Sequence, residues 1–251
     1  MRFAALALAL CASCAAADRT VPVIVELFTS EGCASCPDAD RLLARLERDQ
    51  VVPGAQVLAL EEHVDYWNQL GWVDPFSSPL YRARQNDYAL SLHATDIYTP
   101  QMVINGHAFV GSDAARAIHE IQDAERATTT EVTLSATANS NDAGLVDLSV
   151  AIANPPNTKW RDSNVYLAVT EKGLITSVRG GENHGRTPRH SSVVRSFGII
   201  GRVKPQGANG GQLVSTLKLP PEWKRENLRA VVFVQERETL RITGAGSIDL
   251  H

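Results

Sequence analysis

Residues 23–46 read VIVELFTSEGCASCPDADRLLARL, and this stretch decides the fold of the first half of the chain. Its opening run, Val23–Phe28, is almost wholly apolar, which is typical of a strand buried on both faces. Thr29–Gly32 interrupt that run, and leucines then recur at helical spacing. The stretch therefore predicts a strand, a short turn and a helix that opens at Cys33 and Cys36.

The two cysteines of this stretch are candidates for redox chemistry. Only two small residues, Ala34 and Ser35, separate Cys33 from Cys36. A thiol at the N-terminal end of a helix lies where backbone N–H groups and the helix dipole favour its ionised form. The position of the pair therefore predicts a reactive thiol.

The start of the chain has the pattern of a cleaved signal peptide. An apolar run over residues 3–10 is followed by three alanines ahead of Asp18. We expect residues 1–17 to be removed and the mature protein to be periplasmic or secreted. A lipoprotein acylated at Cys11 or Cys14 is the alternative.

Removal of that segment leaves Cys33 and Cys36 as the cysteines of the mature chain. Disulfides persist outside the cytoplasm, so we expect these two thiols to act as a pair. The net charge is −4 and no basic run occurs, which argues against a nucleic-acid partner. The apolar run at residues 3–10 is too short for a membrane span, and no further transmembrane segment is visible in the sequence. The pattern does not predict an oligomeric state.

The rest of the first half predicts alternating strands and helices, and closes with a hairpin at Asn105-Gly106. The expected elements are a strand at Val57–Leu60, a helix at Pro79–Leu92, strands at Gln101–Asn105 and His107–Val110, and a helix at Ala114–Arg126.

From residue 131 onward the pattern changes to alternating apolar and polar runs with no helix between them. The runs are Val132–Ala138, Leu145–Ala153, Val165–Glu171, Val193–Ile200, Gln212–Leu219 and Leu228–Gln235. Several such strands favour a sandwich of antiparallel sheets. We therefore expect an α/β domain over residues 18–128 and an all-β sandwich domain over residues 129–251.

A Cys-x-x-Cys pair after the first strand, together with Thr99-Pro100 before the Asn-Gly hairpin, resembles the thioredoxin-like superfamily. The resemblance implies a central mixed sheet flanked by helices and a cis peptide bond at Pro100. It implies that Thr99 offers backbone hydrogen bonds to a bound peptide or mixed disulfide; an ordinary trans-proline turn at the start of a strand is the alternative for Pro100. It also implies that Cys33 is an exposed nucleophile at the helix N-cap and that Cys36 resolves the mixed disulfide. We expect no cofactor beyond this redox-active disulfide.

Two further residues are candidates for the site. Glu26 lies in an apolar strand, where a carboxylate is costly unless it is paired or protonated. Thioredoxins have a buried acid on this strand that relays a proton to the resolving cysteine, so the resemblance implies that role; pairing with an arginine or a place at a sheet edge is the alternative. His63 and Asp65 follow the second strand, whose end faces the cysteine pair in this fold. A structural, hydrogen-bonded histidine is the alternative for His63.

Nearly the whole mature chain resembles an uncharacterised family of exported bacterial proteins that have a thioredoxin-like domain. Residues 25–40, 63–85 and 179–195 carry this resemblance. The last segment is a cationic loop that would bind an acidic partner or lie against the first domain's site; a solvated loop is the alternative. The spacing of its histidines does not identify metal ligands. Its cationic residues are His184, Arg186, Arg189, His190 and Arg195.

These patterns predict a thiol–disulfide oxidoreductase that acts through Cys33 and Cys36 on the disulfides or thiols of partner proteins. The alternatives are a binding module in which the reduced pair captures copper(I) or a partner, and a structural disulfide without turnover. The sequence does not distinguish an oxidant from a reductant or an isomerase.

Overall fold

The computed structural model describes residues 20–138, 144–154, 161–204 and 211–251, and the predicted signal peptide lies outside them. Two single-turn helices, η1 (Asn68–Leu70) and η2 (Arg225–Asn227), accompany the main elements. The main elements are β1 (Val21–Thr29), α1 (Cys36–Asp49), β2 (Ala55–His63), α2 (Pro79–Ser91), β3 (Gln101–Ile104), β4 (Ala108–Val110), α3 (Ala114–Ala127), β5 (Glu131–Ala138), β6 (Leu145–Ala153), β7 (Ser163–Glu171), β8 (Val193–Val203), β9 (Gly211–Lys218), β10 (Leu228–Glu236) and β11 (Ile242–Asp249).

The strands form two sheets, which confirms the mixed α/β character predicted from the sequence. The larger sheet has eight strands in the order β11-β10-β7-β8-β2-β1-β3-β4, and the smaller, antiparallel sheet has the order β5-β6-β9. In the larger sheet β2 pairs in parallel with both β1 and β8. The other pairs of that sheet are antiparallel.

The larger sheet joins strands from both halves of the chain. Its central link is short: Glu61 of β2 is opposite Val193 of β8, and the Glu61 amide donates to the Ser192 carbonyl at 2.9 Å. Four strands that follow residue 160 therefore extend a sheet begun by the N-terminal strands. The division into domains at residue 128 remains a prediction.

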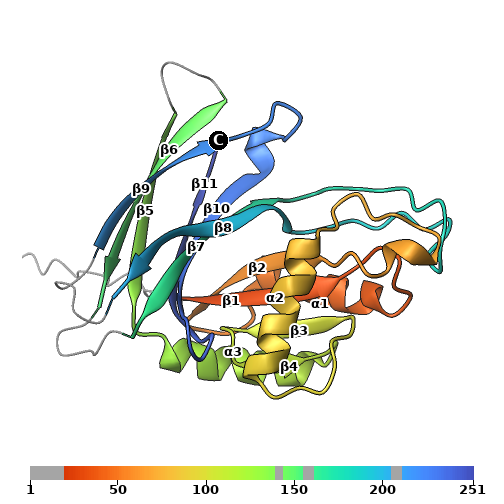
Figure 1. Cartoon of the computed structure of the whole chain (residues 1–251), viewed down its shortest axis with the longest axis horizontal. Coiled ribbons are helices and arrows are strands. Elements are labelled where there is room, and N and C mark those ends of the chain that lie inside the picture. The colour runs from red at the N-terminus through yellow and green to blue at the C-terminus, as the bar shows by residue number, and fades with distance from the viewer. Residues whose placement is uncertain (1–19, 139–143, 155–160, 205–210) are drawn as a thin grey trace, which may run out of the picture.

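Alternation along β1 divides the core into layers (Figure 1). Val23, Val25 and Leu27 pack beneath α1 and α3 on one face of the sheet. Ile24 and Phe28 point to the opposite face, where they pack with side chains of α2 and of β7, β8 and β10. The three-stranded sheet packs against β7 and β10 in a third cluster. Burial on both faces explains why β1 lacks a polar side.

The strand β11 was not predicted, because its centre is Gly244-Ala245-Gly246 and has no large apolar side chain. Its glycines allow β5 to approach closely. A Cβ atom on Gly244 would lie 2.0 Å from the Thr130 carbonyl oxygen, and one on Gly246 would lie 2.5 Å from that of Val132. Close backbone approach is a use of glycine that hydrophobic patterning does not detect.

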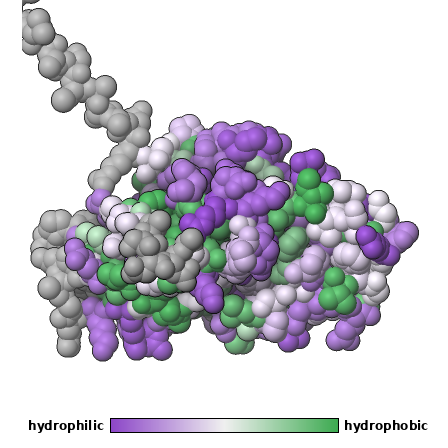
Figure 2. All heavy atoms as spheres, turned by 90° about the horizontal axis from the view of Figure 1, so that it is seen from above, coloured by the Kyte–Doolittle hydropathy of each residue, from purple (hydrophilic) through white to green (hydrophobic). Residues whose placement is uncertain are grey.

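The face drawn in Figure 2 mixes hydrophobic with hydrophilic residues, with green most concentrated at the left-hand end. Over the described ranges, no helix has both the length and the apolar character needed to cross a membrane.

A buried polar network ties α2 to strands from both halves of the chain. The Arg84 guanidinium donates to the carboxylate of Glu26 on β1 and, at 3.2 Å, to the Gln235 amide oxygen on β10. The Tyr88 hydroxyl donates to the other Glu26 oxygen at 2.5 Å. Burial, followed by the charge of Glu26, raises the pKa of neighbouring Glu62 well above its usual range. The network thus keeps the buried Arg84 guanidinium paired with the Glu26 carboxylate.

Replacing Glu26 by alanine tests how much this network contributes to the stability of the fold. Because Glu26→Ala leaves the buried Arg84 without its main counter-charge, we expect the free energy of unfolding to fall by about 3–5 kcal/mol. Urea denaturation followed by circular dichroism measures the change. Glu222→Ala, at an exposed site, is the control and should change the free energy by no more than about 0.5 kcal/mol. Equal effects of the two substitutions would contradict the interpretation.

Candidate functional site

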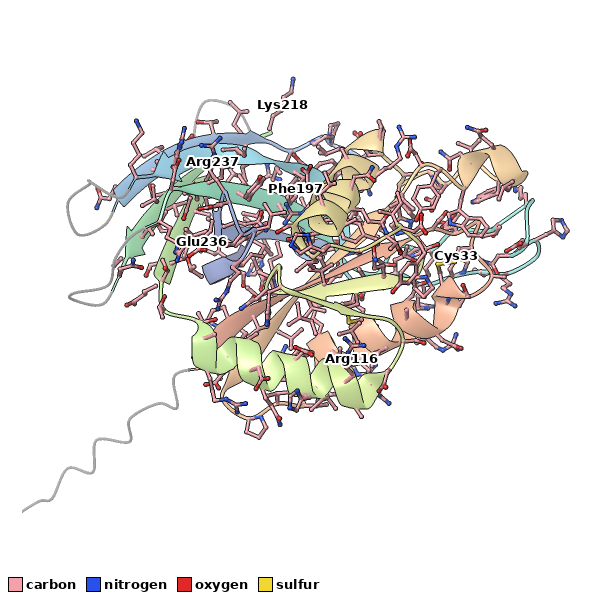
Figure 3. The ribbon with its side chains drawn as sticks, turned by 60° about the horizontal axis from the view of Figure 1, so that its bottom comes forward. Cys33, Arg116, Phe197, Lys218, Glu236 and Arg237 are labelled. Atoms are coloured by element: carbon pink, nitrogen blue, oxygen red, sulfur yellow. A yellow bond between two sulfur atoms is a disulfide. The ribbon has the colours of Figure 1, made fainter. Side chains whose placement is uncertain are left out.

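The two predicted cysteines form a disulfide at the start of α1, near the carboxyl end of β1 (Figure 3). Cys36 is the first residue of the helix and Ser35 is its N-cap, so the predicted N-cap position of Cys33 is wrong. The helix begins late because Pro37, which favours the first positions of a helix, follows Cys36. Cys33 lies instead in the preceding turn, where its amide donates to the Ser30 carbonyl at 3.1 Å.

Both cysteines are fully buried, which corrects the expectation that Cys33 is exposed. Residues 179–190, which we call the covering segment, lie against the turn that contains Cys33. Asn183 of this segment donates from Nδ2 to the carbonyl oxygens of Glu31 and Cys33, at 2.8 Å each. Glu182 accepts a hydrogen bond from the Ala34 amide at 3.2 Å. The cationic loop predicted in the second half thus lies against the cysteine pair.

The covering segment packs closely against the loop that follows η1, and glycine residues allow this close approach. A Cβ atom on Gly180 would lie 2.1 Å from the carbonyl oxygen of Gly71, so a side chain at that position would force the two loops apart. The segment is therefore held by backbone packing as well as by Asn183.

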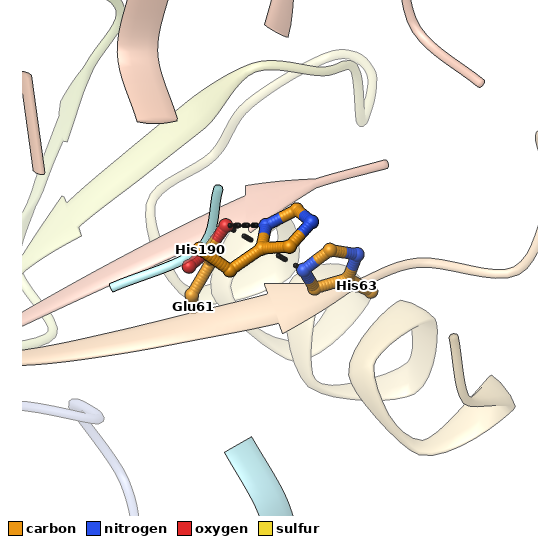
Figure 4. A group of neighbouring side chains, drawn as sticks. All are labelled: Glu61, His63 and His190. Atoms are coloured by element: carbon orange, nitrogen blue, oxygen red, sulfur yellow. Dashed lines mark hydrogen bonds and ion pairs between the residues drawn. The ribbon is translucent and has the colours of Figure 1, made fainter. Parts of the chain in front are cut away.

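Two histidines and three carboxylates form a buried cluster beside the disulfide turn. His190 of the covering segment contacts Glu61 from Nδ1 at 2.6 Å and Glu31 from Nε2 at 3.0 Å. His63, at the end of β2, contacts Asp74 from Nδ1 at 2.7 Å. Figure 4 shows how the side chains of Glu61, His63 and His190 converge. The cluster joins β2, the disulfide turn and the second half of the chain.

The charges of the cluster stabilise one another. Burial alone would raise the pKa of Glu61, but its contacts with His190 and His63 hold that pKa below the usual range. Burial alone would lower the pKa of His190, but its hydrogen bonds to Glu31 and Glu61 raise the pKa to about 9. The cluster therefore holds ionised groups at neutral pH.

His63 and Asp74 form the second charged contact of the cluster. The Asp74 carboxylate, against the effect of burial, raises the pKa of His63 well above its usual range. His63 in turn lowers the pKa of Asp74, again against burial. Because an ionised carboxylate only accepts hydrogen bonds, His63 carries a proton on Nδ1.

Asp40 is an acid in α1, one helical turn after Cys36. It lies four residues after Cys36 in α1, so the two side chains share one face of the helix. Thr29 Oγ1 donates to Asp40 Oδ1 at 2.7 Å. Burial, together with the nearby charge of Glu61, raises the pKa of Asp40 to about 7. At neutral pH this carboxyl group can both take up and release a proton.

The remaining predicted site residues, Glu26, Thr99 and Pro100, lie in different parts of the fold. Glu26 points to the opposite face of the sheet from α1 and pairs with Arg84, as the structural alternative anticipated. Phe28 is opposite Gln101, so Thr99 and Pro100 lie at the same end of the sheet as the disulfide turn. The Thr99–Pro100 peptide bond is cis. Thr99 Oγ1 accepts a hydrogen bond from Trp67 Nε1 at 2.8 Å.

Sequence reasoning did not identify Glu31, Glu61 or Asp74 as parts of the site. For Glu61 a signal was present, because three ionisable residues in a row end an otherwise apolar strand. His190 was named only as part of a cationic loop, since its partners lie 129 and 159 residues away in sequence. His184, Arg186 and Arg189 of the same loop are exposed.

A cavity of about 190 Å³ opens between α1 and the covering segment. Its lining residues include the buried Glu31 and His190, the half-buried Asp40, and the exposed Arg41 and Arg186. The cavity gives a small solute access to the buried cluster.

Two solved structures resemble this fold over 92% of the chain. A crystal structure of an Agrobacterium tumefaciens protein is 25% identical, is covered over 96% of its length and gives a TM-score of 0.68. HBP35 of Porphyromonas gingivalis is 15% identical, is covered over 76% and gives a TM-score of 0.66, a likeness of fold alone. No curated protein matches the chain. Residues 24–235 match the family model described as "Protein of unknown function (DUF1223)", and because this match spans most of the chain, the protein belongs to that family.

Proposed function

We propose that this protein is an exported thiol–disulfide oxidoreductase that acts through Cys33 and Cys36 on partner proteins. The observation that carries the proposal is the disulfide itself, formed by a pair at the start of α1 directly after β1. The element order β1-α1-β2-α2-β3-β4-α3 supports a thioredoxin-like arrangement of residues 18–128. Packing of β5, β6 and β9 against β7 and β10 supports a sandwich-like arrangement of residues 129–251.

We place the reaction in the periplasm or outside the cell. The sequence at residues 1–17 supports export, and a disulfide persists in an oxidising compartment.

The exchange proceeds through a mixed disulfide. In the reducing direction, the Cys33 thiolate attacks one sulfur of a partner disulfide, and the other partner sulfur leaves as a thiolate that takes up a proton. The Cys36 thiolate then attacks Cys33, closes the disulfide and releases the second partner thiolate. Two electrons and two protons pass to the partner. The reverse sequence oxidises a partner dithiol.

Asp40, not Glu26, is the residue we assign to proton transfer. Its carboxyl group shares a helix face with Cys36, and its pKa of about 7 suits both acceptance and return of the Cys36 proton. Glu26 is held by Arg84 and Tyr88 on the other side of the sheet.

The covering segment controls access in this proposal. Both sulfurs are buried, so a partner thiol reaches Cys33 only when the hydrogen bonds from Asn183 open. The segment thereby protects the disulfide between reactions.

A structural disulfide is the second candidate, favoured by the complete burial of both cysteines. The reduction potential separates the two functions. Structural disulfides have potentials below about −300 mV, whereas a pair that exchanges with partners lies above that range. Equilibration with a thiol redox buffer measures this potential.

Replacement of each cysteine tests the assigned roles. We expect Cys33→Ser to lose exchange with a test disulfide protein, because the attacking sulfur is gone. Cys36→Ser should instead accumulate a covalent adduct at Cys33, because no resolving thiol remains. Non-reducing electrophoresis and mass spectrometry detect the adduct. Full exchange activity in folded Cys33→Ser would refute the proposal.

Removal of the Asn183 side-chain amide tests whether the covering segment limits access to the disulfide. Asn183→Ala loses two hydrogen bonds that together contribute about 1–3 kcal/mol, so reduction of the disulfide by dithiothreitol should become about tenfold faster or more. Stopped-flow measurement of thiol release gives the rate. Asn86→Ala, an exposed site on α2, is the control. An unchanged rate would mean that the segment does not limit access.

Neutralisation of Asp40 tests its raised pKa. The folded state holds the Asp40 proton more tightly than the unfolded chain, so this group stabilises the fold at about pH 4 and the contribution is lost as the pH rises through about 7. Relative to wild type, Asp40→Asn should therefore gain stability by up to about 4 kcal/mol across that range.

Urea denaturation in a series of buffers, with a metal chelator present, measures this gain. Asp38→Asn, at an exposed site of the same helix, is the control and should show a flat difference. A flat difference for Asp40→Asn as well would show that its pKa is not raised.

A further inference from the structure

We propose that Glu61, His63 and His190 form a binding site for a divalent first-row transition-metal ion, distinct from the cysteine pair. The site does not depend on the proposed disulfide exchange. Each residue directs one ligand atom to a common point, and the three atoms lie within 4.8 Å of one another. Figure 4 shows this convergence from two elements that are far apart in the sequence.

Two of the distances between these atoms lie on either side of the separation expected for ligands of one metal ion. Glu61 Oε1 lies 3.6 Å from His63 Nε2 and 2.6 Å from His190 Nδ1. Ligands bound to one ion at about 2.0–2.2 Å lie about 3.3 Å from each other. Small movements of the side chains therefore bring all three atoms to one ion.

Each histidine is oriented by a second carboxylate through its other ring nitrogen. His63 Nδ1 contacts Asp74 at 2.7 Å, and His190 Nε2 contacts Glu31 at 3.0 Å. Metal-binding histidines commonly donate their second N–H to a carboxylate, which fixes the ring and strengthens the ligand. The remaining ring nitrogen of each histidine faces Glu61.

The Nε2 atom of His63, which makes no hydrogen bond within the described part of the chain and lies 3.6 Å from Glu61 Oε1, is the second observation that indicates a ligand. His63 is fully buried, and its Nε2 has no hydrogen-bond partner among the residues that the structure describes. Burial of a polar atom without a partner is costly. An ion between His63 and Glu61 would satisfy this atom.

The surroundings suit an ion that enters from solvent and is then held in a dry site. The Phe76 ring packs against both histidine rings, with centroids 5.4 Å away in each case. The cavity between α1 and the covering segment reaches His190 and Glu31 and is lined at its mouth by exposed Arg186. An entry path and an apolar wall are both features of a functional metal site.

The donor set defines the chemical class of the ion. Two imidazole nitrogens and one carboxylate oxygen suit Zn²⁺ or Fe²⁺ and leave positions open for water or a substrate. Such a set is poorly matched to copper(I), which prefers sulfur. The covering segment supplies His190, so metal binding would also hold that segment over the disulfide.

Zinc binding to the tag-free full-length protein tests the site. The protein is stripped with a chelator, kept oxidised so that the Cys33–Cys36 disulfide stays closed, and dialysed against micromolar Zn²⁺. We expect one ion per chain and a higher melting temperature. Co²⁺ in place of Zn²⁺ should give visible absorption bands typical of nitrogen and oxygen ligands, without a sulfur charge-transfer band.

Substitutions assign the site to its residues. His63→Gln and His190→Gln should lose zinc, and Asp74→Asn should bind it about 10- to 100-fold more weakly. His184→Gln, at an exposed position of the covering segment, is the matched control and should bind normally. A Cys33→Ser/Cys36→Ser variant should also keep its zinc, which separates this site from the cysteine pair.

Zinc uptake by the wild-type protein and by the histidine variants decides the proposal. Wild-type protein that takes up no zinc overturns the proposal, and so does a folded His63→Gln/His190→Gln variant that still binds one ion. If the histidine variants do not fold, Glu61→Gln replaces them, because it keeps the size of the side chain and one hydrogen-bond acceptor. Loss of zinc in folded Glu61→Gln supports the site, and unchanged binding overturns it.

Discussion

The arrangement of this protein depends on one buried carboxylate, Glu61, at the point where β2 meets β8. Its amide joins the two strands through Ser192, and its side chain accepts hydrogen bonds from His190 and from the Ser191 amide. A charge in such a place is tolerated only when it is paired and hydrogen-bonded. The second half of the chain supplies every one of these hydrogen bonds, so its position against the disulfide turn follows from the need to satisfy Glu61.

Much of the fold was predictable from local patterns, and the exceptions share a cause. The strand and helix of residues 23–46, the hairpin at Asn105-Gly106 and six of the strands from residue 131 onward have strong hydrophobic periodicity, and the structure contains them. The extension of one sheet across both halves was not predictable, because the link rests on a single pairing of Glu61 with Val193. Periodicity reports which face of an element is buried, but it does not report which partner buries it.

The candidate site was predictable only in part for the same reason. The resemblance identified the cysteine pair, whose disulfide the structure contains, and it pointed to an acid on β1. Burial raises the pKa of Asp40 on α1, whereas Glu26 faces the other side of the sheet and pairs with Arg84. An alternation of side chains along β1 already put Glu26 on the Phe28 face, away from α1. His190 gave no local signal, because its role comes from contacts across the fold.

The covering segment has a consequence for the order in which the protein matures. Asn183 lies 150 residues after the carbonyl group of Cys33 that it covers, and chains are synthesised from the N-terminus. Cys33 and Cys36 are therefore synthesised well before the residues that cover their turn. Once the segment docks, the same disulfide is enclosed. The chain order thus lets the Cys33–Cys36 disulfide form before Asn183 docks against the turn that contains Cys33.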